Sequence, residues 1–269
     1  MTEHLTVDAG TIAYDVTGEG PLVVLAPGMG TGRDAYRFVA PQLVAAGYRV
    51  ATVDLRGAGE SSVGWPSYTR TDIAGDLLAV IRHLGGPAVL VGHSIAGGAA
   101  TVAAAQAPEL ITGIVELAPF TRKQAVKLGD LRNTGYRKGA IRLAGTMMGS
   151  LSSWTSYLAL AGWPGAPTDV EAMLREPGRM KALQGMMKST PADAGAQLAN
   201  VRCPALIVEG SMDPDWADPR AEGEAIVAEM PAGRARLEVI EGAGHYPHVQ
   251  HPAEVTALVV AFLQANARA

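Results

Sequence analysis

The stretch that decides the fold is residues 88–107, with the sequence Ala-Val-Leu-Val-Gly-His-Ser-Ile-Ala-Gly-Gly-Ala-Ala-Thr-Val-Ala-Ala-Ala-Gln-Ala. Its first four residues, 88–91, are apolar and predict a buried strand. The alanine-rich run after Ser94 predicts a helix, because alanine has the highest helix propensity. The chain must therefore reverse its direction between the two elements, with Ser94 at the apex of the turn.

Small residues surround Ser94 and allow the predicted helix to lie close to the strand: Gly92, Ala96, Gly97 and Gly98. In such a turn the serine adopts an uncommon backbone conformation and its hydroxyl projects from the edge of the sheet. A simpler interpretation is that Ser94 is an ordinary helix N-cap, a position that serine favours. The rest of the chain has to distinguish the two.

The composition describes a globular protein of 269 residues, 48% hydrophobic and 18% charged, with a net charge of −4. This balance gives no electrostatic reason to expect a nucleic-acid partner. Cys203 is the single cysteine and cannot form an intrachain disulfide. The first residues lack the basic and apolar regions of a secretory signal, and the apolar stretch 88–107 is interrupted by glycines and polar residues, so we expect a cytoplasmic protein without a membrane span.

Strand and helix patterns alternate over most of the chain, which predicts an α/β fold with a mostly parallel sheet flanked by helices. The expected strands are residues 5–7, 11–16, 22–26, 48–53, 88–91, 111–117, 205–209 and 237–240. The expected helices include residues 34–46, 71–84 and 252–264.

A glycine-rich loop, Pro27-Gly-Met-Gly-Thr-Gly32, follows the apolar strand 22–26. Such a loop can turn its backbone N–H groups toward a phosphate or toward an oxyanion. Asp54, at the end of the next expected strand, fits a dinucleotide site, but Arg33 stands where the third glycine of that motif belongs. A nicotinamide-dependent oxidoreductase therefore stays an alternative, to be tested by nucleotide binding at this loop.

Two late loops complete a pattern with Ser94. Asp213-Pro214 follows the expected strand 205–209, and His245 follows the last strand in a Gly-Ala-Gly-His sequence. With the serine turn, this order of serine, acid and histidine resembles the α/β-hydrolase superfamily, as does the Asp-x-Arg-Gly-x-Gly-x-Ser string at 54–61. The chain departs from the family pattern at Ala96, where a glycine is usual, and at Pro27, where a histidine is frequent.

The resemblance implies roles for five residues. Ser94 would be the nucleophile, His245 the base and Asp213 the acid, while the backbone N–H groups of Met29 and Ile95 would form the oxyanion hole. For the string 54–61 the resemblance implies a structural and not a catalytic role, Asp54 and Arg56 included.

Two further acidic residues lie near these positions. Glu116, at the end of strand 111–117, is the alternative acid, and Asp215 is expected to be a turn residue.

Residues 120–200 interrupt the alternation and predict a helical cap inserted into a core domain formed by 1–119 and 201–269. Its methionines and tryptophans suit an adaptable apolar pocket, although packing between helices is the simpler role for each. We expect four residues to contact a hydrophobic substrate: Trp154, Trp163, Met147 and Tyr246.

The start of this cap is basic, and we interpret it as a solvated helix face, with steering of an anionic substrate as the alternative. Its basic residues are Arg122, Lys123, Lys127, Arg132, Arg137, Lys138 and Arg142.

Three histidines spaced by threes, His245, His248 and His251, suggest a metal site at first sight. Prolines 247 and 252 make one continuous helix unfavourable, and no acidic or cysteine residue completes a ligand set, so no metal is expected. His93 is expected to be structural.

Together these features predict a serine hydrolase that cleaves a carboxylic ester or lactone of a small hydrophobic substrate, without a cofactor. A serine nucleophile argues against haloalkane dehalogenase and epoxide hydrolase chemistry, which need a carboxylate at this position. The alternatives are a slowly turning-over, ligand-sensing signalling protein and a C–C bond hydrolase or cofactor-free perhydrolase with the same three residues.

Overall fold

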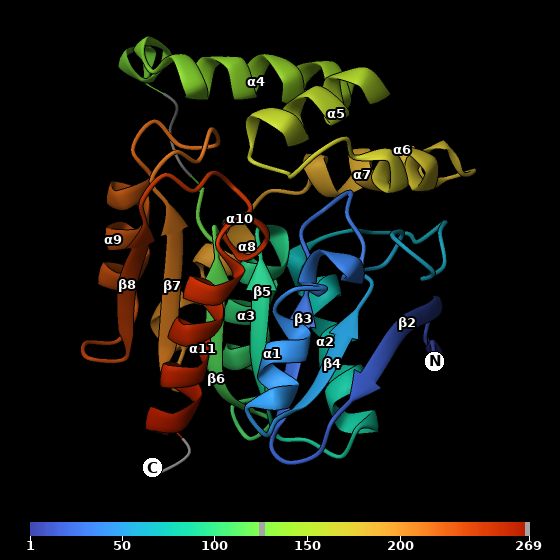
Figure 1. Ribbon diagram of the computed structural model, residues 1–269, viewed down its shortest axis with the longest axis vertical. Coiled ribbons are helices and arrows are strands. Elements are labelled where there is room, and N and C mark those ends of the chain that lie inside the picture. Colours follow the sequence, from blue (N-terminus) through green and yellow to red (C-terminus); the bar gives the residue numbers. More distant parts are fainter. Residues whose placement is uncertain (124–126, 267–269) are drawn as a thin grey trace.

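The computed structural model describes residues 1–123 and 127–266, and it contains one eight-stranded sheet with the strand order β1-β2-β4-β3-β5-β6-β7-β8 (Figure 1). The strands are β1 (Glu3–Val7), β2 (Gly10–Thr17), β3 (Leu22–Ala26), β4 (Arg49–Val53), β5 (Ala88–His93), β6 (Ile111–Leu117), β7 (Ala205–Gly210) and β8 (Ala235–Ile240). The pairs β1–β2 and β2–β4 are antiparallel, and all other pairs are parallel. This confirms the predicted fold class.

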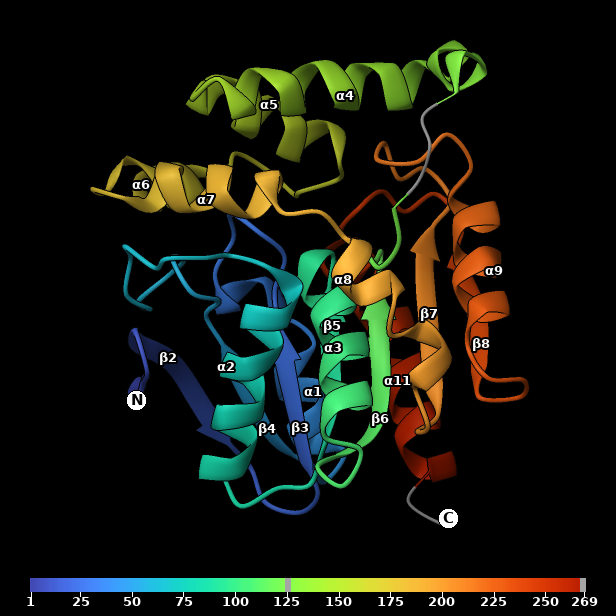
Figure 2. The ribbon, with the colours of Figure 1, turned by 180° about the vertical axis from the view of Figure 1, so that it is seen from behind.

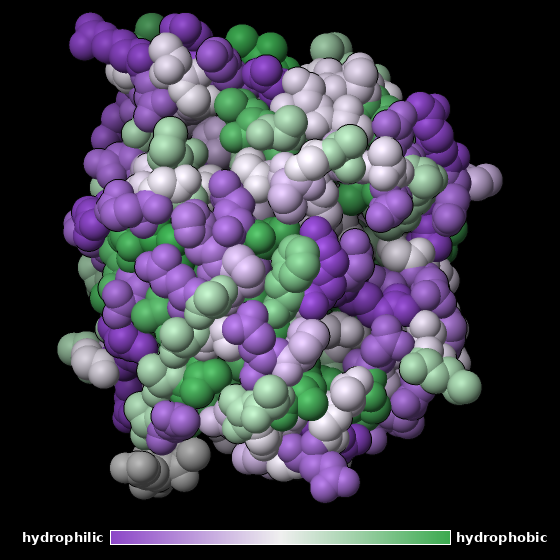
Figure 3. Space-filling view, viewed as in Figure 1, coloured by the Kyte–Doolittle hydropathy of each residue, from purple (hydrophilic) through white to green (hydrophobic). Residues whose placement is uncertain are grey.

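Helices cover both faces of the sheet, as a parallel sheet with apolar strands requires. One face carries α1 (Ala40–Ala45) and α11 (Pro252–Asn266), and the other carries α2 (Arg70–His83), α3 (Ile95–Gln106) and α9 (Pro219–Glu229) (Figures 1 and 2). Hydrophilic and hydrophobic residues are interspersed over the face seen in Figure 3, because the helices turn their apolar sides to the sheet. Within the described ranges, no helix combines the length and apolar character needed to span a bilayer.

The helix expected over residues 34–46 is wrong in its extent. The chain forms a 3₁₀ turn, η1 (Arg33–Tyr36), followed by the separate short helix α1. Pro41 is the reason, because proline has no N–H to donate within a helix and is accepted only in the first turn, which is where it stands in α1.

Between β6 and β7 the described residues, 118–123 and 127–204, form helices and no strand. They are η2 (Leu128–Arg132), α4 (Thr134–Met147), α5 (Leu151–Leu160), α6 (Thr168–Arg175), α7 (Arg179–Lys188), α8 (Ala192–Gly195) and η3 (Leu198–Asn200). Helices α4 to α7 lie above the carboxyl ends of the parallel strands (Figures 1 and 2). By contrast, Ala194 and Leu198 are buried in the same apolar cluster as α2 and α3. The domain boundaries at 120 and 200 stay a prediction.

The Asp-x-Arg-Gly-x-Gly-x-Ser string holds loops of the core together. The carboxylate of Asp54 is buried and accepts hydrogen bonds from the backbone N–H groups of Arg33 and Glu60, at 2.7 and 2.8 Å. Arg56 forms a two-pronged ion pair with Asp76 on α2, at 2.7 and 2.9 Å. Both interactions fix the strand-to-loop connections, as expected of a structural role.

Gly92 is where β5 and α3 come closest. A Cβ atom at this position would lie 2.2 Å from the backbone oxygen of Ala96, and that backbone cannot move without displacing α3. We expect Gly92→Ala to lower the free energy of unfolding by about 3 kcal/mol or more, the upper range for overpacking.

Urea denaturation measures this change, and Gly75→Ala is the matched control. Gly75 lies in α2, where an added Cβ meets nothing within 4 Å. That variant should gain roughly 0.5–1 kcal/mol, because alanine favours the helix. An equal stability change in the two variants would contradict the close packing of β5 and α3.

Candidate active site

Ser94 lies between β5 and α3 in a strained backbone conformation, with φ 56° and ψ −119°. A positive φ is rare for residues other than glycine, so the surrounding structure must hold it in place. Its backbone N–H donates to the carbonyl of Leu117 at 2.9 Å, and its carbonyl accepts from Phe120 at 3.1 Å. The buried Oγ has no hydrogen-bond partner among the described residues and does not cap α3. The interpretation of Ser94 as an ordinary N-cap is therefore wrong.

His245 and Asp213 follow β8 and β7, whose carboxyl ends lie at the same edge of the sheet. The Nδ1 of His245 lies 2.7 Å from Oδ2 of Asp213, and both side chains are buried. Within the described residues Nε2 of His245 makes no hydrogen bond, so it is available to a further partner. His93 ties this histidine to the serine turn, because its Nε2 lies 2.7 Å from the carbonyl oxygen of His245.

Asp215 is a member of this cluster that sequence reasoning missed. Its Oδ2 lies 3.4 Å from Nδ1 of His245, and it accepts a hydrogen bond of 2.7 Å from the hydroxyl of Tyr157 on α5. Its backbone N–H donates to Oδ1 of Asp213 at 2.8 Å. Asp215 does lie in a turn, but it also connects the helices above the sheet to the histidine. The Asp-Pro-Asp spacing was the available signal.

The charges around His245 set its proton affinity. Burial by itself lowers the pKa of the imidazole, but the carboxylates of Asp213 and Asp215 outweigh it and raise the pKa to about 9. Burial raises the pKa of Asp215 to about 6, against the opposing effect of His245. The imidazolium form is therefore favoured at neutral pH before a substrate binds.

This raised pKa predicts the pH dependence of catalysis. His245 must be neutral to act as the general base, so kcat/KM should rise with pH. The midpoint of this rise should lie at about 9, the pKa of His245. In Asp215→Asn one of the negative charges that raise this pKa is gone, so the midpoint should move to lower pH.

The measurement is a pH profile of kcat/KM, with Glu241→Gln as the control. This change removes the same charge from a carboxylate whose side chain is 76% exposed, and the midpoint should stay in place. A midpoint that stays or rises in Asp215→Asn would contradict the electrostatic role of Asp215.

Glu116, the alternative acid, has other partners. Its carboxylate is fully buried in β6 and accepts hydrogen bonds from Thr101 and Thr121, the latter at 2.8 Å. Burial raises the pKa of Glu116 to about 7. The structure brings Asp213, and not Glu116, into hydrogen-bond contact with His245.

The glycine-rich loop after β3 lies directly against the serine turn. A Cβ atom at Gly28 would lie 2.7 Å from Nδ1 of His93 and 3.1 Å from Cβ of Ser94, so the loop can approach this closely only with glycine. Ile95 is the first residue of α3, where backbone N–H groups have no partner within the helix. Gly28 and Ile95 thus lie next to Ser94 from two segments, and the oxyanion role of the N–H groups of Met29 and Ile95 stays a prediction.

A cavity of about 370 Å³ opens beside Asp215 and beneath the helices between β6 and β7. Its lining residues are Met29, Arg70, Phe120, Arg122, Lys123, Tyr136, Ala140, Leu143, Met186, Met187, Ser189, Pro191, Pro214, Asp215 and Trp216. The side chain of Phe120 connects the cavity to the histidine, since its ring centroid is 6.0 Å from that of His245.

The four residues expected to contact substrate are not among the residues that line this cavity, and their contact with substrate stays a prediction. Trp154, Trp163 and Tyr246 are buried in one cluster: Trp154 stacks on Tyr157, and Trp163 meets Tyr246 edge to face, with ring centroids 5.2 and 5.1 Å apart. Large aromatic side chains gain most by filling the contact between packed elements. Met147 is half-buried on α4, and its carbonyl accepts a hydrogen bond of 3.0 Å from the side-chain amide of Gln184 on α7.

The histidines spaced by threes do not gather as metal ligands. His248 is buried, stacks on Tyr36 with ring centroids 4.9 Å apart, and has its pKa lowered by burial to about 3, so it is neutral. Among the described residues one set of three groups has potential metal-binding atoms within 4.8 Å of one another: Asp213, Asp215 and His245. In this set Nδ1 of His245 is already hydrogen bonded to Oδ2 of Asp213, and Oδ2 of Asp215 accepts from Tyr157.

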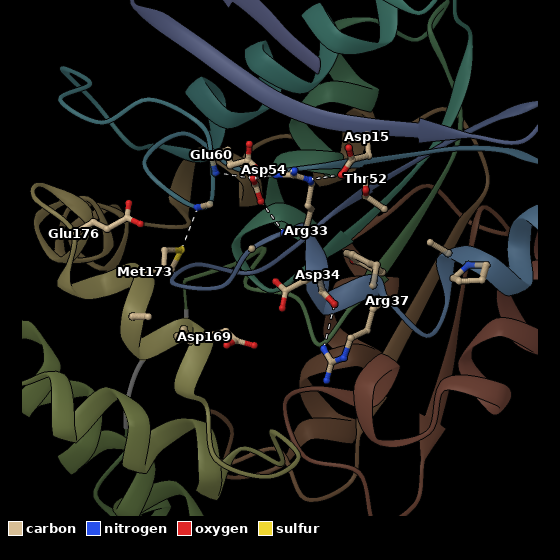
Figure 4. A pocket seen from close by; sticks show the side chains of 17 residues that line it. Asp15, Arg33, Asp34, Arg37, Thr52, Asp54, Glu60, Asp169, Met173 and Glu176 are labelled. Atoms are coloured by element: carbon tan, nitrogen blue, oxygen red, sulfur yellow. Dashed lines mark hydrogen bonds and ion pairs between the residues drawn. The ribbon is translucent and has the colours of Figure 1, made fainter. Parts of the chain in front are cut away.

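A larger cavity of about 680 Å³ lies away from Ser94, beside η1 and α6 (Figure 4). The acidic residues that line it outnumber the basic ones. Its carboxylates belong to Asp15, Asp34, Asp54, Glu60, Asp169 and Glu176, and its guanidinium groups belong to Arg33 and Arg37. This excess of negative charge disfavours a dinucleotide phosphate, and Asp54 is already hydrogen bonded to protein groups. The geometry therefore does not favour the nicotinamide alternative.

Comparisons with known proteins agree with this geometry. A model of the alpha/beta hydrolase family matches residues 23–258. The chain is 26% identical to a 2-(acetamidomethylene)succinate hydrolase of Mesorhizobium japonicum, over 96% of this chain and 94% of that protein. It is 28% identical to a 2-hydroxy-6-oxononadienedioate/2-hydroxy-6-oxononatrienedioate hydrolase of Burkholderia vietnamiensis, over 96% of this chain and 93% of that protein.

The fold is also shared with solved structures. An esterase from Exiguobacterium antarcticum superposes with a TM-score of 0.81 at 20% identity, covering 98% of this chain and 100% of that one. At this identity the likeness concerns the fold alone. Because the family model spans most of the sequence and the sheet carries the serine turn at the expected strand end, the chain belongs to the α/β-hydrolase family.

Proposed function

We propose that this protein is a serine hydrolase that cleaves a carboxylic ester or lactone of a small, largely apolar substrate through an acyl-enzyme. The observation that carries the proposal is Ser94, held at φ 56° with its Oγ unpaired among the described residues, together with His245, which contacts the neighbouring His93 and has its Nδ1 fixed by a carboxylate. A nucleophile, a base and a group that orients the base are the three parts that acyl transfer requires.

In the first step Oγ of Ser94 attacks the substrate carbonyl carbon while Nε2 of His245 takes the serine proton. The tetrahedral oxyanion forms against the backbone N–H groups of Met29 and Ile95, each of which contributes about 3 kcal/mol in enzymes of this kind. His245 then returns the proton to the leaving alcohol oxygen as the ester bond breaks. A water molecule, deprotonated by the same histidine, releases the acid from Ser94. The steps use no cofactor.

Fixing Nδ1 is the role of Asp213 in this scheme. A carboxylate at 2.7 Å keeps the Nδ1 proton in place, so that Nε2 is the basic nitrogen, and it stabilises the imidazolium that forms. Apolar side chains from Met29, Leu143 and Met186 would contact the substrate in the neighbouring cavity. A cavity near the lower end of the usual ligand-pocket range, about 300–1,000 Å³, favours a small molecule.

The same residues can attack carbonyls other than esters, and two relatives are named as hydrolases of compounds whose names contain no ester: 2-(acetamidomethylene)succinate and 2-hydroxy-6-oxononadienedioate/2-hydroxy-6-oxononatrienedioate. C–C or amide hydrolysis is therefore the second candidate. A signalling protein with slow turnover is the third, and multiple fast turnovers would exclude it.

The test is hydrolysis of p-nitrophenyl esters of graded chain length together with mass spectrometry of the quenched enzyme. We expect many turnovers per enzyme molecule and a transient mass increase equal to the acyl group on the peptide that contains Ser94. Acylation of any other residue, or no turnover of any ester or lactone, would overturn the proposal.

A further inference from the structure

We propose that the substrate carries a carboxylate, and that Arg70, which lines the cavity and is linked to the serine turn through Phe120, binds it. This inference rests on the proposed function and adds a substrate class to it. The substrate would thus be a half-ester, a lactone acid or a similar molecule with an anionic group separated from the scissile carbonyl by an apolar segment.

Arg70 is a buried cation without an ion pair. It is the first residue of α2 and only 3% exposed, yet no carboxylate among the described residues forms a salt bridge with it. Arg56, the other buried arginine, is paired with Asp76 at 2.7 Å. The carboxylate of Asp193 lies nearby but is hydrogen bonded to the backbone and hydroxyl of Thr71.

A buried arginine without a partner is costly, since a charge removed from water must be compensated by polar groups. Burial lowers the pKa of Arg70 to about 10, which reflects this cost. A bound carboxylate would supply the missing charge.

Some N–H groups of the Arg70 guanidinium have no hydrogen-bond partner among the described residues. Its Nε donates to the carbonyl of Phe120 at 2.7 Å, and its Nη1 donates to Oγ of Ser189 at 3.1 Å. Its Nη2 makes no hydrogen bond to the described part of the chain. A planar guanidinium with free donors fits the two oxygens of a carboxylate.

Backbone connections place this group close to Ser94. Phe120 accepts from Arg70 through its carbonyl and donates from its N–H to the carbonyl of Ser94 at 3.1 Å. In addition, a Cβ atom at Gly98, one turn along α3 from the serine, would lie 2.9 Å from Cδ of Arg70. The backbone of Phe120 is therefore hydrogen bonded both to the guanidinium of Arg70 and to the carbonyl of Ser94.

The cavity joins this cation to the catalytic cluster. Arg70 and Asp215 both line it, and the apolar side chains of Met29, Met186 and Leu143 line it as well. The neighbouring Arg122 is held by Glu222 and Glu229 at 2.9 Å each, so it is neutralised.

Lys123, which also lines the cavity, is exposed and adds positive charge at the rim. The arrangement suits a molecule with one reactive carbonyl, an apolar spacer and one anionic end.

The experiment compares mono-p-nitrophenyl glutarate with p-nitrophenyl pentanoate, which has the same chain length but no charge. We expect wild type to favour the glutarate half-ester in kcat/KM. In Arg70→Gln, kcat/KM for the half-ester should fall about 10- to 100-fold, the range for a hydrogen-bonded charge, mainly through KM, while pentanoate changes little. Arg70→Lys should keep part of the preference.

Arg132→Gln is the matched control, because Arg132 is exposed and lies outside the cavity lining. It removes the same charge and should leave the preference unchanged. Equal losses on both esters in Arg70→Gln would show that Arg70 is only structural, and no preference in wild type would also overturn the inference. If neither ester is turned over, the proposed function fails instead.

Inhibition gives a readout that does not depend on turnover of the charged ester. Glutarate should inhibit pentanoate hydrolysis competitively in wild type and much less in Arg70→Gln, whereas the uncharged glutaramide should inhibit both proteins weakly and equally. Inorganic phosphate inhibiting at a lower concentration than glutarate would overturn the assignment of the anion as a carboxylate.

Discussion

Replacement of Ser94 by alanine is expected to lower kcat by about 10⁴-fold or more. In serine hydrolases, removal of the nucleophile alone lowers kcat about as much as removal of the serine, histidine and acid together. The substituted side chain makes no hydrogen bond in the structure, so the fold loses no polar contact. The measurement is initial-rate hydrolysis of the best p-nitrophenyl ester, with circular dichroism to confirm that the variant is folded.

Ser94→Gly provides a second control for folding. Glycine accepts the positive φ of 56° at this position without strain, so this variant should be equally inactive and more stable by about 1 kcal/mol. A folded Ser94→Ala protein that retains wild-type kcat would remove Ser94 from the mechanism.

Replacement of Asp213 by asparagine is expected to lower kcat by about 10⁴-fold. Asparagine has one acceptor oxygen for the two donors that Asp213 satisfies, the backbone N–H of Asp215 and Nδ1 of His245, and with its NH2 group facing Nδ1 the wrong tautomer of His245 results. Asp215, 3.4 Å from the same nitrogen, should support a residual rate. The Asp213→Asn/Asp215→Asn double variant should therefore be slower than Asp213→Asn alone.

Glu116→Gln is the control for the alternative acid. Its carboxylate already accepts hydrogen bonds from Thr101 and Thr121, and glutamine can accept one of them. We expect kcat to change by less than about 5-fold, as for a buried polar substitution outside the reacting groups. A loss as large as that of Asp213→Asn would mean that Glu116 is the acid after all.

The sequence determined the framework of this site because the relevant signals are local. Apolar runs of four or five residues identified β3, β5 and β7, and the small residues around Ser94 identified the sharp turn. Parallel strands place their carboxyl ends at one edge of the sheet, so residues that follow them, such as Asp213 and His245, could be predicted to meet.

Local patterns were insufficient where a neighbouring element decides the outcome. The interruption of the expected helix 34–46 at Pro41, the burial of Trp154 and Trp163 in a cluster, and the contact of Asp215 with Tyr157 all depend on packing. Aromatic residues in the segment above the sheet are equally suited to line a pocket or to fill a contact, and composition does not distinguish these roles.

Only the tertiary structure revealed the environment of Arg70. In the sequence it is one basic residue at the start of a helix, and nothing in its local pattern distinguishes it from the residues of the basic run after Phe120. Its partners, Phe120 and Ser189, are 50 and 119 positions away along the chain. Whether a charge is buried, paired or free depends on such distant contacts, and these arise only when the helices between β6 and β7 lie over the sheet.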